Sequence, residues 1–167
     1  FISFVIEAAN NTQKLPIHLL KEFCNRIEHP IILLGNKNEA ATGDTIAGLD
    51  SIKIYNACGK FNLNEMADLL RQSKLVISFD SDLQKIAFAL NKSVIAVWGA
   101  TTPILGTGPY YGNTLKEKIN SENIYLNLPC QPCSNNGTQK CPLEHFNCME
   151  KQDINFLLDK VYRHLKN

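Results

Sequence analysis

The chain has 167 residues, of which 44% are hydrophobic and 20% are charged, and its formal net charge at neutral pH is +1. These values are those of one ordinary globular domain, and they exclude the strongly basic surface of a nucleic-acid-binding protein. No apolar run reaches the length of a membrane span, and Phe1–Ile6 lacks the basic start and cleavage site of a signal peptide. We therefore expect a reduced, cytoplasmic location. Because the sequence starts at once with a strand-like run and has no initiator Met, we expect it to belong to a longer protein.

Short apolar segments alternate along the chain with segments of helical spacing. The short segments are apolar throughout, which is typical of strands buried on both faces, whereas the helical segments carry apolar residues three or four positions apart. In chain order the pattern predicts strand 1–6, helix 16–27, strand 30–35, helix 38–49, strand 52–57, helix 62–70, strand 74–79, helix 81–90, strand 93–98, strand 123–128 and helix 154–165.

Local signals mark the starts of two of these helices. Pro16 is expected at the first helical position, where its missing N–H costs nothing. Asn62 followed by Glu65 resembles a capping box. The residues expected on the buried faces are Ile17, Leu20, Cys24 and Ile27 in the first helix and Leu63, Met66, Ala67 and Leu70 in the second.

Strands that alternate with helices predict a single α/β domain over residues 1–167, a Rossmann-like doubly wound parallel sheet. One segment, 99–122, is long, irregular and rich in Gly, Pro and Thr. Loops of that length are usually functional or disordered.

Three segments that follow predicted strands are candidates for a binding site, because ligands of open parallel sheets bind beyond the carboxyl ends of the strands. Residues 7–14 are polar and lead into a helix start, where free N–H groups favour an anion, but they do not form the G-x-G-x-x-G dinucleotide motif. Residues 80–82 follow the fourth strand and residues 98–103 follow the fifth. Each segment also has an ordinary explanation, as a βα loop, a helix N-cap and a turn respectively.

Five segments resemble, in order, motifs of glycosyltransferase family 9, the ADP-heptose:lipopolysaccharide heptosyltransferases and their relatives. The family elements are K-x-W-P, a Gly-containing helix entry, D-S/T-G-x-x-H-I-A-x-A, a strand with an F-G-x-T-x-P loop, and a C-x-P-C…C…C tail. Their counterparts here are Gln13–Pro16, Asn56–Glu65, Asp80–Leu90, Ser93–Pro103 and Cys130–Cys148.

The resemblance implies one half of a GT-B fold, in which two Rossmann-like domains face each other across a cleft. The chain resembles only the C-terminal domain, which binds the nucleotide-sugar donor. The N-terminal domain, which binds the acceptor and carries the proposed catalytic Asp, would then lie outside residues 1–167. The implied reaction is inverting sugar transfer to lipopolysaccharide or a related glycan, with no metal needed for chemistry. The implied partners are an ADP-heptose-like donor, that acceptor domain and, peripherally, the inner membrane, but no nucleic acid.

Carried over motif by motif, the resemblance implies a set of donor-binding residues, namely Gln13, Lys14, Glu39, Asp80, Ser81, Asp82, Lys85 and Thr101. Several positions depart from the family pattern. Gln13 replaces a phosphate-contacting Lys, Glu7 replaces a Gly, and Asp82 and Lys85 stand where the family has Gly and His. Asp82 adds a like charge near a diphosphate, so we expect weak ADP binding even if it pairs with Lys85. An alternative is a degenerate domain that serves as a binding or assembly module.

Six cysteines fall into two groups. Cys24 and Cys58 lie in apolar segments and are expected in the core. Cys130, Cys133, Cys141 and Cys148, with His145 as a substitute ligand, have the content of a structural zinc site, although the spacing contains only one C-x2-C pair. Structural zinc, reduced thiols and disulfides remain open for these four. A zinc-stabilised module of unrelated function is a third hypothesis for the chain.

Overall fold

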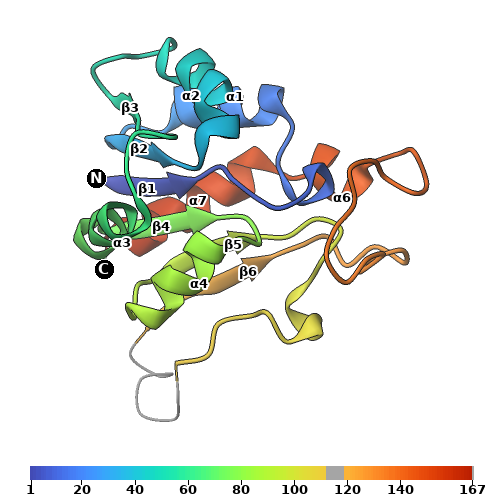
Figure 1. Ribbon diagram of the computed structural model, residues 1–167. Coiled ribbons are helices and arrows are strands. Elements are labelled where there is room, and N and C mark those ends of the chain that lie inside the picture. The colour runs from blue at the N-terminus through green and yellow to red at the C-terminus, as the bar shows by residue number, and fades with distance from the viewer. Residues whose placement is uncertain (112–118, 167) are drawn as a thin grey trace.

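The computed structural model describes residues 1–111 and 119–166 and shows one parallel sheet between two layers of helices (Figure 1). The strands are β1 (Ile2–Val5), β2 (Ile31–Leu34), β3 (Ile54–Asn56), β4 (Leu75–Ser78), β5 (Val94–Val97) and β6 (Glu122–Ile124). Their order in the sheet is β3-β2-β1-β4-β5-β6, and every pairing is parallel. The prediction of a Rossmann-like, doubly wound α/β domain is therefore confirmed.

Helices cover both faces of the sheet. The α-helices are α1 (Ile17–Arg26), α2 (Ala40–Ala47), α3 (Leu63–Gln72), α4 (Asp82–Ala89), α6 (Asn147–Glu150) and α7 (Ile154–Lys166). Three 3-10 turns, which the sequence did not predict, are η1 (Asn11–Gln13), η2 (Lys37–Glu39) and η3 (Pro103–Leu105). Helices α1, α2 and α7 contribute to one apolar core, and α3 and α4 contribute to the other.

The two cores explain why the central strands are mostly apolar on both faces, with few polar residues such as Ser3 and Ser78. On the α1 face, the rings of Phe23 and Phe79 both meet Phe4 edge to face, with centroids 5.4 and 5.8 Å away. On the opposite face, Trp98 is fully buried and its indole N–H donates to the side chain of Asn123 (2.9 Å). Cys24 and Cys58 are buried in the first core, as expected.

Several element boundaries and buried faces differ from the prediction. Ile52 is 99% exposed in a turn, so β3 is shorter than the predicted strand 52–57, and β6 lies earlier than 123–128. Ile17 and Leu63 are exposed at the first positions of their helices, because neighbours in the next turn, such as Leu20 and Met66, occupy the core side. Pro16 is the N-cap of α1 rather than its first residue.

The Asn62–Glu65 capping box is present: the Asn62 backbone N–H donates to the Glu65 carboxylate at 2.7 Å. Of the predicted loop 99–122, residues 112–118 lie outside the described part and Glu122 belongs to β6. Among the described residues, none of the helices combines the length and apolarity needed to cross a bilayer.

Candidate functional site

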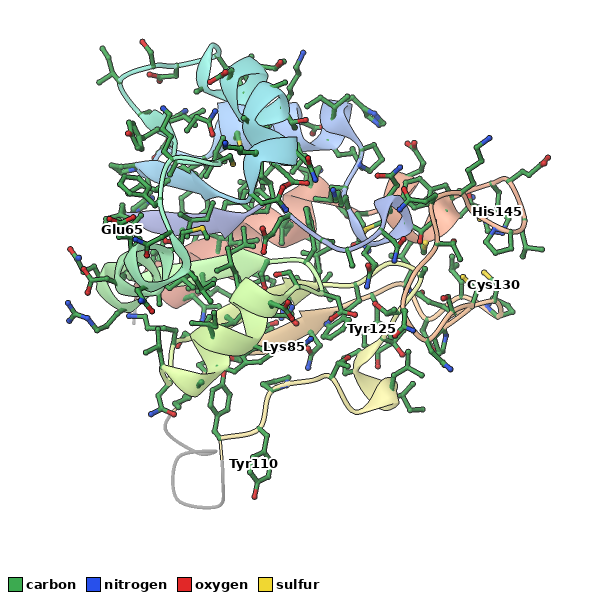
Figure 2. The ribbon with its side chains drawn as sticks, in the orientation of Figure 1. Glu65, Lys85, Tyr110, Tyr125, Cys130 and His145 are labelled. Atoms are coloured by element: carbon green, nitrogen blue, oxygen red, sulfur yellow. The ribbon has the colours of Figure 1, made fainter. Side chains whose placement is uncertain are left out.

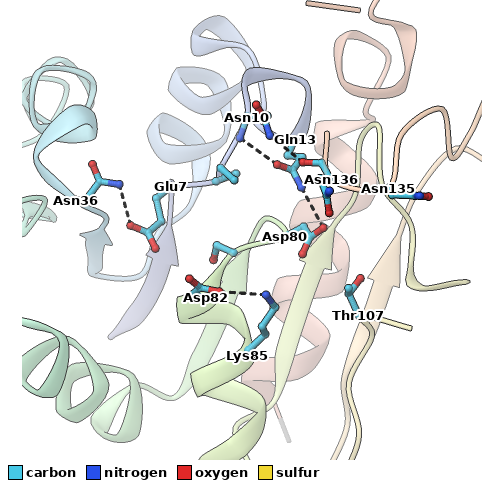
Figure 3. A pocket seen from close by; sticks show the side chains of 13 residues that line it. Glu7, Asn10, Gln13, Asn36, Asp80, Asp82, Lys85, Thr107, Asn135 and Asn136 are labelled. Carbon is cyan, nitrogen blue, oxygen red and sulfur yellow. Dashed lines mark hydrogen bonds and ion pairs between the residues drawn. The ribbon is translucent and has the colours of Figure 1, made fainter. Parts of the chain in front are cut away.

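The strand order reverses between β1 and β4. Strands β2 and β3 are added on one side of β1, and the chain then crosses back to place β4, β5 and β6 on the other side. In doubly wound sheets this switch point opens a crevice at the carboxyl ends of the strands. A pocket of about 400 Å³ lies there, lined by the segments that follow β1 and β4 (Figure 3). Both termini lie at the opposite edge of the sheet (Figure 1).

Three buried or half-buried side chains form what we call the floor of the pocket: Gln13, Asp80 and Thr101. Asp80 Oδ2 accepts hydrogen bonds from Thr101 Oγ1 (2.8 Å) and Gln13 Nε2 (3.1 Å). Gln13 Oε1 in turn accepts from the backbone N–H of Asn10 at 3.1 Å. The floor thus joins the three segments that the sequence singled out as candidates for a binding site, 7–14, 80–82 and 98–103.

Close backbone contact brings the loop after β5 to the loop after β1. The Ala100 N–H donates to the Thr12 carbonyl at 3.0 Å. A Cβ at Gly99 would stand 2.3 Å from that same carbonyl oxygen, so only glycine permits the approach. Thr101 is consequently held, fully buried, beneath the pocket.

The rim of the pocket is the first turn of α4. Ser81 is its N-cap, and its hydroxyl accepts from the Gln84 N–H at 3.2 Å. Asp82 and Lys85 form an i,i+3 ion pair, with Nζ and Oδ1 3.1 Å apart. The Asp82 side chain is 88% exposed, so this pair adds little to stability. The free N–H groups of the turn suit an anion.

Lys14 and Glu39 pair with each other rather than facing the pocket. Lys14 Nζ lies 2.7 Å from Glu39 Oε1, and Glu39 is only 5% exposed. The second carboxylate oxygen of Glu39 is buried and has no hydrogen-bond partner in the described part of the chain. Both residues line a neighbouring cavity of about 410 Å³ that also has α1 residues in its wall.

The pocket is acidic for a phosphate site. Three carboxylates, those of Glu7, Asp80 and Asp82, line the pocket, and Lys85 contributes a positive charge to the lining. Burial, followed by the charge of Glu39, raises the pKa of Glu7, and hydrogen bonds from Asn36 oppose that rise in part. A diphosphate would therefore bind between the helix dipole of α4, which attracts it, and carboxylates, which repel it.

The structure separates the predicted site residues into three groups. Gln13, Asp80, Ser81, Asp82 and Lys85 line one pocket; Thr101 supports it from below; and Lys14 and Glu39 lie beside it. Asn10 belongs to the candidate segment 7–14, whereas Asn36, Thr107, Asn135 and Asn136 are pocket residues that the prediction missed. Asn36, two residues after the end of β2, could have been found from its place near a strand end. Asn135 and Asn136 come from the cysteine segment and carry no such signal.

The segment 130–148, which we call the cysteine loop, packs against the loop after β1. All six cysteines of the chain are free thiols, and Cys148 is buried in the α1-side core. Burial raises the pKa of the Cys148 thiol to about 11, and the charges of Cys133, Cys141 and Cys130 add to that effect. Cys130 Sγ lies 4.0 Å from His145 Nε2, and both side chains are labelled in Figure 2. Within residues 1–111 and 119–166, no three His, Cys, Asp or Glu side chains are placed to hold a metal ion.

Sheet order, switch-point pocket and helix layers define a doubly wound, Rossmann-like domain. Residues 10–143 match the sequence profile of glycosyltransferase family 9 (heptosyltransferase), and the chain belongs to this family.

Known proteins similar to the chain include lipooligosaccharide heptosyltransferase 2 of Haemophilus influenzae, 34% identical over 79 residues, which cover 45% of this chain and 23% of that protein. In fold the chain is similar to E. coli ADP-heptose lps heptosyltransferase II, with a TM-score of 0.76, 18% identity, and coverage of 98% of this chain and 46% of that one. It is also similar to the dodecameric iron-containing heptosyltransferase TibC in complex with ADP-D-beta-D-heptose, with a TM-score of 0.64, 14% identity, and coverage of 99% and 45%. The chain thus spans less than half the length of each of these proteins.

Proposed function

We propose that the chain binds an ADP-heptose-like nucleotide-sugar donor in the pocket between β1 and β4. We further propose that it is the C-terminal, donor-binding half of a GT-B glycosyltransferase that acts in the cytoplasm on lipopolysaccharide or a related glycan. The observation that carries the proposal is the hydrogen-bonded floor. Asp80, Gln13 and Thr101 come from three separate family motifs and meet beneath one pocket.

The placement of the donor follows from the polarity of the site. The diphosphate would lie at the first turn of α4, where backbone N–H groups are free and Lys85 is near. Asp80, whose Oδ2 is occupied by the floor, would accept a hydroxyl of the sugar with its other oxygen. The complex of a fold relative with ADP-D-beta-D-heptose supports this ligand class.

Isothermal titration calorimetry with ADP and ADP-heptose tests the proposal. We expect saturable, weak binding of both to the wild-type chain. We expect Asp80→Asn to weaken the binding of ADP-heptose, because Asp80 is proposed to contact the sugar, and Asn64→Ala, the control, to match wild type. Asn64 is exposed on α3, away from the pocket. Absence of binding at millimolar ADP would contradict the proposal.

A second candidate function is a degenerate domain that has kept the fold but serves in binding or assembly. The acidic pocket favours it, because Glu7 and Asp82 stand where the resemblance places glycines. The same calorimetry separates the two, since a degenerate domain predicts no heat of nucleotide binding under conditions in which the chain is folded.

Catalysis is a property that we assign to the parent protein rather than to this chain. A GT-B active site lies between two domains, and we propose that the acceptor domain, with any peripheral contact to the inner membrane, lies in the other half. We expect no glycosyl transfer by residues 1–167 alone. Transfer detected with this chain would contradict that assignment.

Structural zinc at Cys130, Cys133, Cys141 and Cys148 stays a prediction. The thiols are neighbours, since their charges act on Cys133 and Cys148, but the described residues do not form a ready ligand set. Metal analysis of the purified chain checks it: one bound zinc per chain supports the site, and a metal-free, fully folded chain contradicts it. The proposed chemistry itself needs no cofactor.

A further inference from the structure

The pocket between β1 and β4 has two ends with different chemistry. Figure 3 shows Glu7 and Asn36 on one side, Asp82 and Lys85 in the middle, and the cysteine loop on the other side. With the diphosphate at the first turn of α4, the nucleoside and the sugar must extend toward opposite ends. The question is which end receives the sugar.

The end formed by the cysteine loop and by part of the segment after β5 is neutral and rich in hydrogen-bonding groups. It is lined by Thr107, Asn135 and Asn136. The Thr107 hydroxyl is buried and has no hydrogen-bond partner in the described part of the chain, although a buried hydroxyl is usually paired. Asn135 and Asn136 are exposed, and within the described residues their carboxamides form no hydrogen bond with the protein. These groups can donate and accept, which matches sugar hydroxyls.

The loop that carries these asparagines is held firmly on the segment after β1. Thr12 Oγ1 and the backbone of Thr138 exchange hydrogen bonds, both at 2.8 Å. The Asn10 side chain donates to the Asn136 carbonyl at 2.8 Å. Gly137, with φ of +79°, lies so close to the floor that a Cβ there would be 2.7 Å from the Gln13 carboxamide. The backbone that carries the asparagines is therefore held in place without a ligand, which lowers the backbone entropy lost on binding.

We propose that Asn136, with Asn135 and Thr107, binds the sugar of the donor, so that the cysteine loop determines which sugar is accepted. This inference rests on the proposed donor-binding function and adds to it a residue set outside the family motifs. Gly137 is a positioning residue, because it allows the loop to approach Gln13. The nucleoside then lies at the opposite end, beside Glu7 and Asn36.

The test compares the affinities of ADP and ADP-heptose for wild type, Asn136→Ala and the control Asn64→Ala. One hydrogen bond to a neutral group changes affinity by about threefold to tenfold. We expect Asn136→Ala to lose that factor for ADP-heptose while its affinity for ADP is unchanged, and Asn64→Ala to match wild type for both. An Asn136→Gln variant, which keeps the carboxamide but extends it, should change the preference between ADP-sugars rather than the affinity for ADP.

Three results would overturn the inference in different ways. If Asn136→Ala weakens ADP and ADP-heptose equally, the asparagine acts on the nucleotide and the donor-binding function stands. If the variant affects neither ligand, the sugar lies elsewhere and the function again stands. If wild type binds neither ligand, the donor-binding function fails together with the inference.

Discussion

The floor and the rim of the pocket both carry replacements of the family pattern, and they differ in burial. On the floor, Gln13 stands in place of a Lys, and its carboxamide donates to Asp80 in a buried network. On the rim, Asp82 and Lys85 replace Gly and His, and both side chains lie mainly in water, paired with each other. A buried replacement must keep the hydrogen bonds of the polar groups around it, because an unpaired buried group destabilises the fold. An exposed replacement changes stability little and acts mainly through its charge on the ligand. The floor should therefore control folding and the rim should control affinity.

The largest effect is expected from removal of the Asp80 carboxylate. Asp80→Ala leaves the Gln13 amide and the Thr101 hydroxyl without their acceptor, at a cost of about 1–3 kcal/mol for each group left unpaired. Urea denaturation should show a clear fall in the free energy of unfolding. Asp82→Ala, on the exposed rim, should stay within about 0.5 kcal/mol of wild type. Equal losses in the two variants would erase the distinction between floor and rim.

The next effect concerns contact between the cysteine loop and the floor. Gly137→Ala places a methyl group 2.7 Å from the Gln13 carboxamide and must displace it from Asp80. We expect destabilisation of about 1–3 kcal/mol and weaker ADP binding. Because Gln13→Ala removes the obstructing group, Gly137→Ala should cost distinctly less in that background, leaving the strain of the left-handed backbone. Strictly additive effects would show that Gly137 does not act through Gln13.

On the rim, Asp82→Gly should tighten ADP binding. The full repulsion between a carboxylate and a phosphate about 4 Å apart amounts to a few kcal/mol at a semi-exposed site but only about 1 kcal/mol in water. Because Asp82 is 88% exposed, we expect about a tenfold gain or less, diminishing as salt is added. Adding Gln13→Lys should tighten binding further by supplying a phosphate contact. Low micromolar binding by wild type, or no response to either change, would show that the phosphate does not approach these positions.

The smallest predicted effect is a pH dependence from Glu7. Its pKa is raised in the folded chain, chiefly by burial, so the folded state favours the protonated acid. Ionisation of Glu7 therefore lowers stability as pH rises from the ordinary value of 4.5 through the raised folded pKa. Protonation also removes a negative charge from the pocket.

Affinity for ADP-heptose, which has no titrating terminal phosphate, should rise a few-fold as pH falls through this range. Glu7→Gln should flatten the profile near its low-pH level. An unchanged pH profile in Glu7→Gln would assign the dependence to another group.

Sequence patterns predicted the fold well, because strands buried on both faces are short runs of mostly apolar residues that are easily recognised. The floor was partly predictable, since Asp80 and Thr101 follow strands and lie in motifs. The sequence could not predict interactions between side chains that are distant along the chain. Examples are the ion pair of Lys14 with Glu39 and the hydrogen bond of Gln13 with Asp80. The contribution of Asn135 and Asn136 was also hidden, because a tertiary contact between Thr12 and Thr138 brings them to the pocket.

The central claim, that the pocket between β1 and β4 binds the donor nucleotide, is tested most directly by titrating ADP into the ¹⁵N-labelled chain. The account predicts that the amide resonances of residues 7–13 and 81–85 shift the most and saturate together, and that they saturate at a lower ADP concentration in Asp82→Gly. Saturable shifts confined to a distant surface, such as the pocket beside α3 at Phe61 and Leu69, or no shifts at millimolar ADP, would contradict it.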